Sequence, residues 1–240
     1  MKYRNIILAG LLFCSVAVPT HAQHRHRHND QVIHAYPVLG VTVSQMEGDE
    51  LKGFDKVGFT AGVGALMDVG DGDMWKMSVE ADFSQRGAKN VTADPYSLLG
   101  FTLNYVDIPL MFHYQDPYGG LVAGLGLGYS RLVQQPHGEI RYQPTYFIPD
   151  TSNMSFLKND LAIVADIRFT LWKGLKLNLR YQYSLIPVKK SMTFTQYTTS
   201  EKFETWSNDC FNSSVSVRLL YVFGDDGRRH SIPYYKKKKR

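Results

Sequence analysis

The sequence predicts an all-β fold, an eight-stranded antiparallel up-and-down barrel that crosses a membrane. Eight stretches alternate apolar with polar residues, and the seven gaps between them run 11, 6, 14, 5, 26, 2 and 23 residues. Alternating long loops and short turns are typical of a transmembrane barrel with extracellular loops and tight periplasmic turns. An even number of strands also places both chain ends in the periplasm. The expected strands are residues 33–45, 57–67, 74–86, 101–114, 120–133, 160–172, 175–187 and 211–223.

The first 22 residues have the pattern of a signal peptide. A basic start, Met1-Lys2-Tyr3-Arg4, precedes the apolar run Ile6 to Val18, and Ala22 offers a small residue at a cleavage point. Residues 23–31 are expected to be a flexible terminus rich in His and Arg. Its histidines could bind zinc, copper or nickel, but the interleaved arginines oppose cation binding. The sequence therefore predicts a solvated segment with no metal and no cofactor.

Residues 225–240 are predicted to form a basic periplasmic tail outside the barrel, which takes up residues 32–224. Seven of the 27 basic residues lie in this tail. Without them and the leader's Lys2 and Arg4, 18 basic residues face 22 acidic ones, which argues against a nucleic-acid partner. The tail could contact anionic lipid headgroups or cell-wall polymer, or it could be solvated without a specific partner. Cys210 is the only cysteine after the leader, so no intrachain disulfide is expected.

The strand faces predict apolar residues toward lipid and polar residues toward the lumen. In residues 160–172 the odd positions from 161 to 171 are apolar, whereas the even ones include Asp166, Arg168 and Thr170. The strands are about as long as a tilted transmembrane strand requires, and aromatic residues gather near their ends, as in interfacial girdles. Charges of both signs also lie in the middle of the polar faces, where a solvated face would not need such pairing.

These inward charges predict a network of ion pairs in a narrow lumen, because buried charge is costly unless it is paired. Eight strands leave room for side chains and little else, so we expect a packed interior and not a pore. His113 is expected to belong to the same network. Inward glycines of the second and fifth strands, such as Gly62 and Gly124, are expected to admit long side chains from across the barrel. Pro109 is expected to mark a local bulge. The predicted lumen network comprises Lys76, Glu80, Asp82, Asp107, Asp166, Arg168, Lys176, Arg180 and Arg218.

Three segments resemble the PorT-like outer-membrane β-barrel family, which is common in Bacteroidetes. Residues 78–88 resemble the family's strand that ends in a YSQKG-type motif, with Phe83 and Arg86 in place of Tyr and Lys. Residues 105–114 resemble its YLEIPLLLKY-type strand, and residues 119–129 its glycine-rich strand. The resemblance covers roughly residues 30–224. It implies an eight-stranded barrel in the outer membrane of a Gram-negative cell and assigns no catalytic residue.

The long loops are the predicted recognition surface, because loops on a rigid scaffold usually carry it. Their aromatic residues among Thr, Ser and Asn suit binding of an extracellular protein or glycan, although they could equally seal the barrel mouth. The expected function is that of a monomeric structural or surface-interaction protein, and not an enzyme. The candidate recognition residues are Tyr142, Tyr146, Phe147, Tyr197, Phe203 and Trp206.

Two other function classes stay open on the sequence alone. An outer-membrane enzyme of acyl-transfer or hydrolase type would need a nucleophile and a base at the rim of the barrel. Neither His113 nor His137 has a neighbouring Ser and acid at a spacing typical of a catalytic motif. A soluble periplasmic barrel with an apolar ligand cavity is the other alternative. The segment Asp68 to Asp73 has alternate acids like a calcium loop, but Lys76 and Met77 follow where the pattern needs a glutamate, which favours a plain turn.

Overall fold

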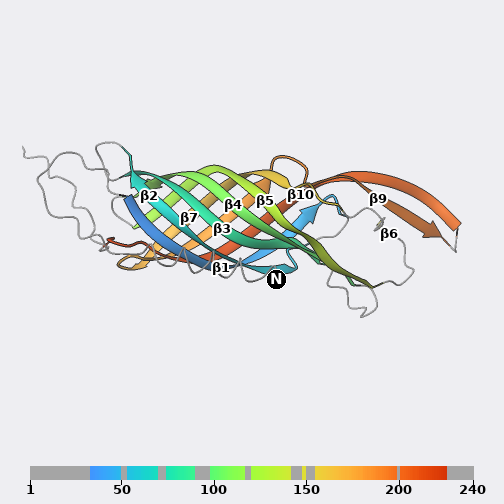
Figure 1. Ribbon diagram of the computed structural model, residues 1–240, viewed down its shortest axis with the longest axis horizontal. Coiled ribbons are helices and arrows are strands. Elements are labelled where there is room, and N and C mark those ends of the chain that lie inside the picture. The colour runs from blue at the N-terminus through green and yellow to red at the C-terminus, as the bar shows by residue number, and fades with distance from the viewer. Residues whose placement is uncertain are drawn as a thin grey trace, which may run out of the picture. The chain divides into compact units, whose positions relative to one another are not determined.

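A computed structural model shows a closed antiparallel β-barrel (Figure 1). It describes residues 33–49, 53–69, 74–89, 98–116, 120–141, 148–149, 155–198 and 201–225. The strands pair in the order β1-β2-β3-β4-β5-β7-β8-β10, and β10 closes the ring by pairing with β1. Within these residues no helix is long and apolar enough to cross a membrane. The strands are β1 (Ile33–Glu47), β2 (Lys56–Asp68), β3 (Trp75–Lys89), β4 (Leu98–Gln115), β5 (Leu121–Arg141), β6 (Ile148–Pro149), β7 (Asn159–Trp172), β8 (Leu175–Ser184), β9 (Lys189–Thr198) and β10 (Glu201–Tyr221).

All eight predicted barrel strands are present, but the prediction of a 23-residue loop before the last strand is wrong. Residues 189–198 form β9, which pairs with the first half of β10, and β10 begins at Glu201 instead of residue 211. Figure 1 shows these two strands projecting beyond the barrel. The segment is rich in Thr, Tyr and Phe, residues that favour strands, and a two-stranded ribbon needs no barrel neighbour. Elsewhere, β5 continues to Arg141 and β8 ends at Ser184.

The bulge predicted at Pro109 is also wrong. The β3–β4 register is the same on both sides of this residue, with Val79 opposite Leu110 and Asp82 opposite Asp107. Pro109 lies opposite Gly128 of β5 without an inserted residue. The irregularity in β4 lies instead between Thr102 and Tyr105, where the pairing with β5 shifts.

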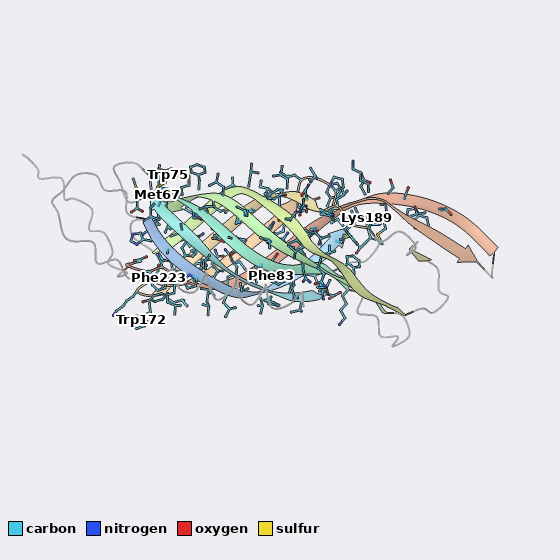
Figure 2. The ribbon with its side chains drawn as sticks, in the orientation of Figure 1. Met67, Trp75, Phe83, Trp172, Lys189 and Phe223 are labelled. Atoms are coloured by element: carbon cyan, nitrogen blue, oxygen red, sulfur yellow. The ribbon has the colours of Figure 1, made fainter. Side chains whose placement is uncertain are left out.

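The barrel is apolar outside and polar inside. On β1, Leu39 and Val41 are 65% and 56% exposed, whereas Thr42 and Ser44 are buried. Figure 2 shows Trp75, Trp172 and Phe223 at the end where the short turns lie. These residues belong to a girdle of aromatic side chains, in which the rings of Trp75 and Tyr114 lie 5.2 Å apart. Such girdles form where a barrel meets the membrane–water interface.

Apolar residues close the interior at both ends. At the end with the short turns, a lower apolar layer comprises Tyr36, Val38, Leu66, Leu220 and Val222. At the loop end, an upper apolar layer comprises Met46, Ala88, Phe101, Leu103, Tyr105, Leu132, Phe156, Val188, Met192 and Cys210. Phe156 and Val188 come from connections between strands and are 3% and 0% exposed, so these connections fold into the mouth. Glu80 and the charged residues in contact with it lie between the two layers.

Candidate functional site in the barrel interior

Glu80 of β3 is the centre of the charged interior. Its Oε1 accepts hydrogen bonds from the Tyr36 hydroxyl at 2.7 Å, from Arg168 at 3.1 Å and from Arg180 at 2.9 Å. Its Oε2 lies 2.8 Å from Arg180 Nη1 and accepts from Arg218 Nη1 at 3.0 Å. One carboxylate therefore joins four other strands, β1, β7, β8 and β10, across the lumen.

Two further carboxylates complete a charge-balanced cluster with Glu80. Asp166 accepts from Arg180 at 3.0 Å and from Arg168 at 3.3 Å, and Asp82 accepts from Arg218 at 3.1 Å. Three acids thus face three arginines. Each of these side chains is nearly fully buried, so removal of one partner would leave an uncompensated charge. We call these six residues the central cluster.

A second, smaller cluster lies nearer the loop end. Arg86 pairs with Asp107, and its Nη1 lies 3.8 Å from Asp160. Ser84 donates to Asp107 at 2.6 Å and Ser184 donates to Asp160 at 2.8 Å. Arg86 and Asp160 are lumen residues that the predicted network does not include. Both share the inward parity of their strands, Arg86 with Glu80 and Asp160 with Asp166, so strict use of the period of two would have found them.

Lys76 and Lys176, which the sequence groups with the network, lie apart from both clusters. Lys76 pairs with Asp68 at the start of β3. Lys176 lies 2.8 Å from Asp225, just past the end of β10. Both pairs lie at the rim with the short turns, and their aspartates are partly exposed. The structure therefore places seven of the nine predicted residues, Glu80, Asp82, Asp107, Asp166, Arg168, Arg180 and Arg218, in the two inner clusters.

A polar cavity between the two clusters has a volume of only about 10 Å³. That is roughly the space of a single water molecule. Its lining consists of hydroxyl, amide and charged groups, so a water molecule would find several partners there. The lining residues are Thr42, Thr60, Asp82, Ser84, Arg86, Asp107, Arg180, Gln182, Ser214, Ser216 and Arg218.

Inward glycines make room for neighbouring side chains. The prediction that they admit long Arg and Lys side chains from across the barrel is wrong. A Cβ on Gly124 would lie 2.2 Å from Nδ1 of His113, and a Cβ on Gly64 would lie 2.4 Å from the ring of Tyr36. A Cβ on Gly62 would lie 2.1 Å from Asp82. The admitted side chains therefore come from hydrogen-bonded neighbouring strands. They are not long Arg or Lys residues reaching from across the barrel.

His113 lies in a Ser–His–Asp arrangement that its sequence neighbours do not reveal. Its Nε2 lies 2.8 Å from Oγ of Ser78, and its Nδ1 lies 3.4 Å from Oδ1 of Asp166. Arg168 also donates to Nε2 at 3.2 Å, so this nitrogen is an acceptor and the ring proton belongs on Nδ1. His113 is 0% exposed, and neither it nor Ser78 lines the cavity. All three side chains, Ser78, His113 and Asp166, are buried in the lumen.

The predicted recognition residues fall in two groups. Tyr142, Tyr146 and Phe147 lie outside the described residues. Tyr197 and Phe203 lie on the strands β9 and β10, and Trp206 packs against the upper apolar layer. The strand β9 and the first half of β10 were not predicted, so these residues belong to a projecting ribbon and not to an irregular loop.

Several other predicted features also lie outside the described part of the chain. They are the signal peptide, the His/Arg-rich terminus, the basic tail and most of the turn after Asp68. Among the residues that are described, no group of three or more His, Cys, Asp or Glu side chains could hold a metal ion.

The sequence matches a known protein family. Residues 6–223 match the family described as outer membrane protein beta-barrel domain. No curated protein sequence matches the chain. Because the family match covers most of the chain and the barrel is apolar outside, the alternative of a soluble periplasmic barrel is wrong, whereas the finer PorT-like resemblance stays a prediction.

Solved barrels are similar at low identity. One is Ail of Yersinia pestis in complex with the heparin analogue sucrose octasulfate, at 14% identity and a TM-score of 0.42, covering 80% of this chain and 99% of that one. Neisserial surface protein A follows, at 12% identity and a TM-score of 0.44, covering 79% and 97%. OprG from Pseudomonas aeruginosa is 13% identical with a TM-score of 0.33, covering 78% and 96%. None is close enough to carry an argument about function. The chain belongs to the outer membrane protein β-barrel domain family and is a protein of the outer membrane.

Proposed function

We propose that this chain is a non-porin barrel of a Gram-negative outer membrane that acts as a structural or surface-interaction protein. The observation that carries the proposal is the filled interior, in which charged clusters lie between an upper and a lower apolar layer. Such a barrel has no room for solute passage and serves as a rigid support. In keeping with the PorT-like resemblance, the function then lies in what the barrel presents at its surface, and the barrel acts as a monomer.

The presented surface is the ribbon of β9 and β10 together with the loop between β5 and β7. Tyr197 and Phe203 lie on the ribbon, and the sequence between β5 and β7 contains Tyr142, Tyr146 and Phe147. Aromatic side chains on such elements suit binding of an extracellular protein or glycan. The basic tail, at the other side of the membrane, would contact anionic headgroups or cell-wall polymer.

Cells that display the chain on their surface provide the test. They are incubated with arrays of extracellular matrix proteins and glycans, beside cells without the chain. We expect chain-dependent binding that falls at least tenfold when Tyr197 and Phe203 are both replaced by Ser. The matched control is Tyr183→Phe, which changes an aromatic residue on the lipid-facing wall and should leave binding intact. Chain-dependent binding that is unchanged in the double variant would contradict the assignment of the ribbon.

A hydrolase is the alternative function that needs a test. Ser78, His113 and Asp166 contact one another in the order of a nucleophile, a base and an orienting acid. We propose that this trio has no catalytic role, since all three side chains are buried. A fluorophosphonate probe applied to the full chain in detergent should not label Ser78. Labelling that disappears in Ser78→Ala would instead establish the enzyme.

A further inference from the structure

Arg131 on β5 lies near the loop end of the lipid-facing wall, where one more exposed apolar residue, Val133, follows it on the same face. Below it on the same outward face are exposed residues, from Leu121 through Leu125 and Leu127 to Tyr129. Ten residues separate Leu121 from Arg131, and a strand rises about 3.3 Å per residue. With a strand tilt of roughly 40°, this corresponds to about 25 Å along the membrane normal, the height of the apolar band of such barrels. Arg131 therefore lies at the level of the outer-leaflet headgroups.

One neutral neighbour, Asn159, orients this arginine and is itself hydrogen-bonded to Tyr129. Asn159 of β7 lies directly opposite Arg131 in the strand register. Its Oδ1 accepts hydrogen bonds from Nη1 of Arg131 at 2.5 Å and from the hydroxyl of Tyr129 at 2.9 Å. A single neutral acceptor orients the guanidinium while leaving its charge and its other N–H groups free to bind a ligand.

The surroundings of Arg131 add positive charge. Within the described part of the chain Arg131 makes no ion pair with an acid. The exposed Lys158 precedes Asn159, and its carbonyl accepts from the amide of Leu132, which follows Arg131. The backbones of the two cationic residues are thus close to each other near the loop end of β5 and β7.

The opposite side of the barrel carries an acid near the same end of the barrel. Glu47 ends β1, four strands from β5 in either direction around the ring. Its Oε2 accepts from the hydroxyl of Tyr183 at 2.9 Å. Both sides therefore combine an outward tyrosine with a charged residue, but only the β5–β7 side attracts an anion.

We infer that Arg131, together with Lys158 and supported by Asn159 and Tyr129, binds the phosphate of an anionic lipid of the outer leaflet. The guanidinium fork matches the geometry of phosphate oxygens and binds them through two parallel hydrogen bonds. The ring of Tyr129 lies at the interface, where it contacts both the acyl chains and the headgroup. The bound lipid lies flat along the wall, with its acyl chains over Leu125 and Leu127.

Native mass spectrometry of the full chain in a neutral detergent tests this inference, with lipid A as the probe and phosphatidylcholine for comparison. We expect one preferred lipid A adduct, weakened roughly five- to tenfold in Arg131→Gln and less in Arg131→Lys, because each near-surface charge contributes about that factor. Glu47→Gln is the matched control on the opposite wall and should bind as the wild type does. Equal binding by Arg131→Gln and wild type, with unchanged heat-dependent gel migration, would overturn the inference.

Two further measurements separate this site from other sources of anion binding. A chain in which Lys236, Lys237, Lys238, Lys239 and Arg240 are all replaced by Gln should keep the preferred adduct. Loss of the adduct in that chain would assign the lipid to the tail and overturn the site at Arg131. Excess inorganic phosphate should not displace lipid A, because the acyl chains supply contacts that free phosphate lacks; full displacement would overturn the assignment to a lipid.

Discussion

Nη1 of Arg218 lies 3.0 Å from Oε2 of Glu80, although the two residues are 138 positions apart in the chain. Their strands, β10 and β3, are separated in the sheet by β1 and β2. The contact therefore crosses the lumen and exists only when the barrel has closed. Because Arg168 and Arg180 meet the same carboxylate from two other strands, Glu80 connects the ring at its centre.

Replacement of Glu80 by Gln should destabilise the barrel strongly. The variant leaves three buried arginines with only two carboxylates, and breaking a buried pair in this way costs roughly 3–5 kcal/mol. The measurement is urea-induced unfolding of the protein reconstituted in lipid vesicles, followed by heat-dependent gel migration. Glu47→Gln, at an exposed acid, should change the free energy of unfolding by less than about 1 kcal/mol. Equal midpoints for Glu80→Gln and wild type would show that the central cluster does not stabilise the fold.

Gly124→Ala should destabilise the barrel by overpacking. The added Cβ would lie 2.2 Å from Nδ1 of His113 and 2.6 Å from Oδ1 of Asp166, so a buried side chain must move. Overpacking of this kind costs typically about 1–3 kcal/mol. Gly100→Ala is the control, because its Cβ meets nothing nearer than 3.5 Å. The same unfolding assay should show a lower midpoint for the first variant and an unchanged or higher one for the second; the reverse order would refute the packing described for β5.

Thiol labelling of intact cells should report the orientation of the chain. In a Cys14→Ser background, Cys210 is the remaining cysteine and is 0% exposed. A membrane-impermeant maleimide should therefore not react with it before denaturation. Ser207→Cys, at an exposed position on the projecting part of β10, should react readily. If Ser207→Cys reacts only after the outer membrane is permeabilised, the ribbon faces the periplasm and the orientation is wrong.

The alternation of apolar and polar residues was sufficient to predict the eight barrel strands and which face of each points inward. Each barrel strand has lipid on one side and packed polar groups on the other. Asp166 and Arg168, two positions apart, had to share a face, and they do. Which charges meet could not be read in the same way. The contact of Arg218 with Glu80 and the contact of Ser78 with His113 depend on closure and register, and no local pattern encodes either.

The ribbon of β9 and β10 was missed for a different reason. Residues 189–210 contain few aliphatic residues and many Thr, Ser and charged ones, which reads as a loop when strands are found by an apolar face. A ribbon outside the membrane needs no lipid-facing side, so its signal is the strand preference of Thr, Tyr, Phe and Trp alone. Phe156 and Val188 were likewise unpredictable as parts of the upper apolar layer, because they lie in connections and not on strands.

Single-channel recording in planar lipid bilayers tests the central claim, that the interior is filled, most directly. The full chain is refolded in detergent, its closed form is verified by heat-dependent gel migration, and a porin at the same protein concentration is the positive control. The two apolar layers and the cavity of about 10 Å³ predict no conductance steps above the lipid baseline. Regular steps that depend on the presence of the chain would contradict this account and show that the interior conducts ions.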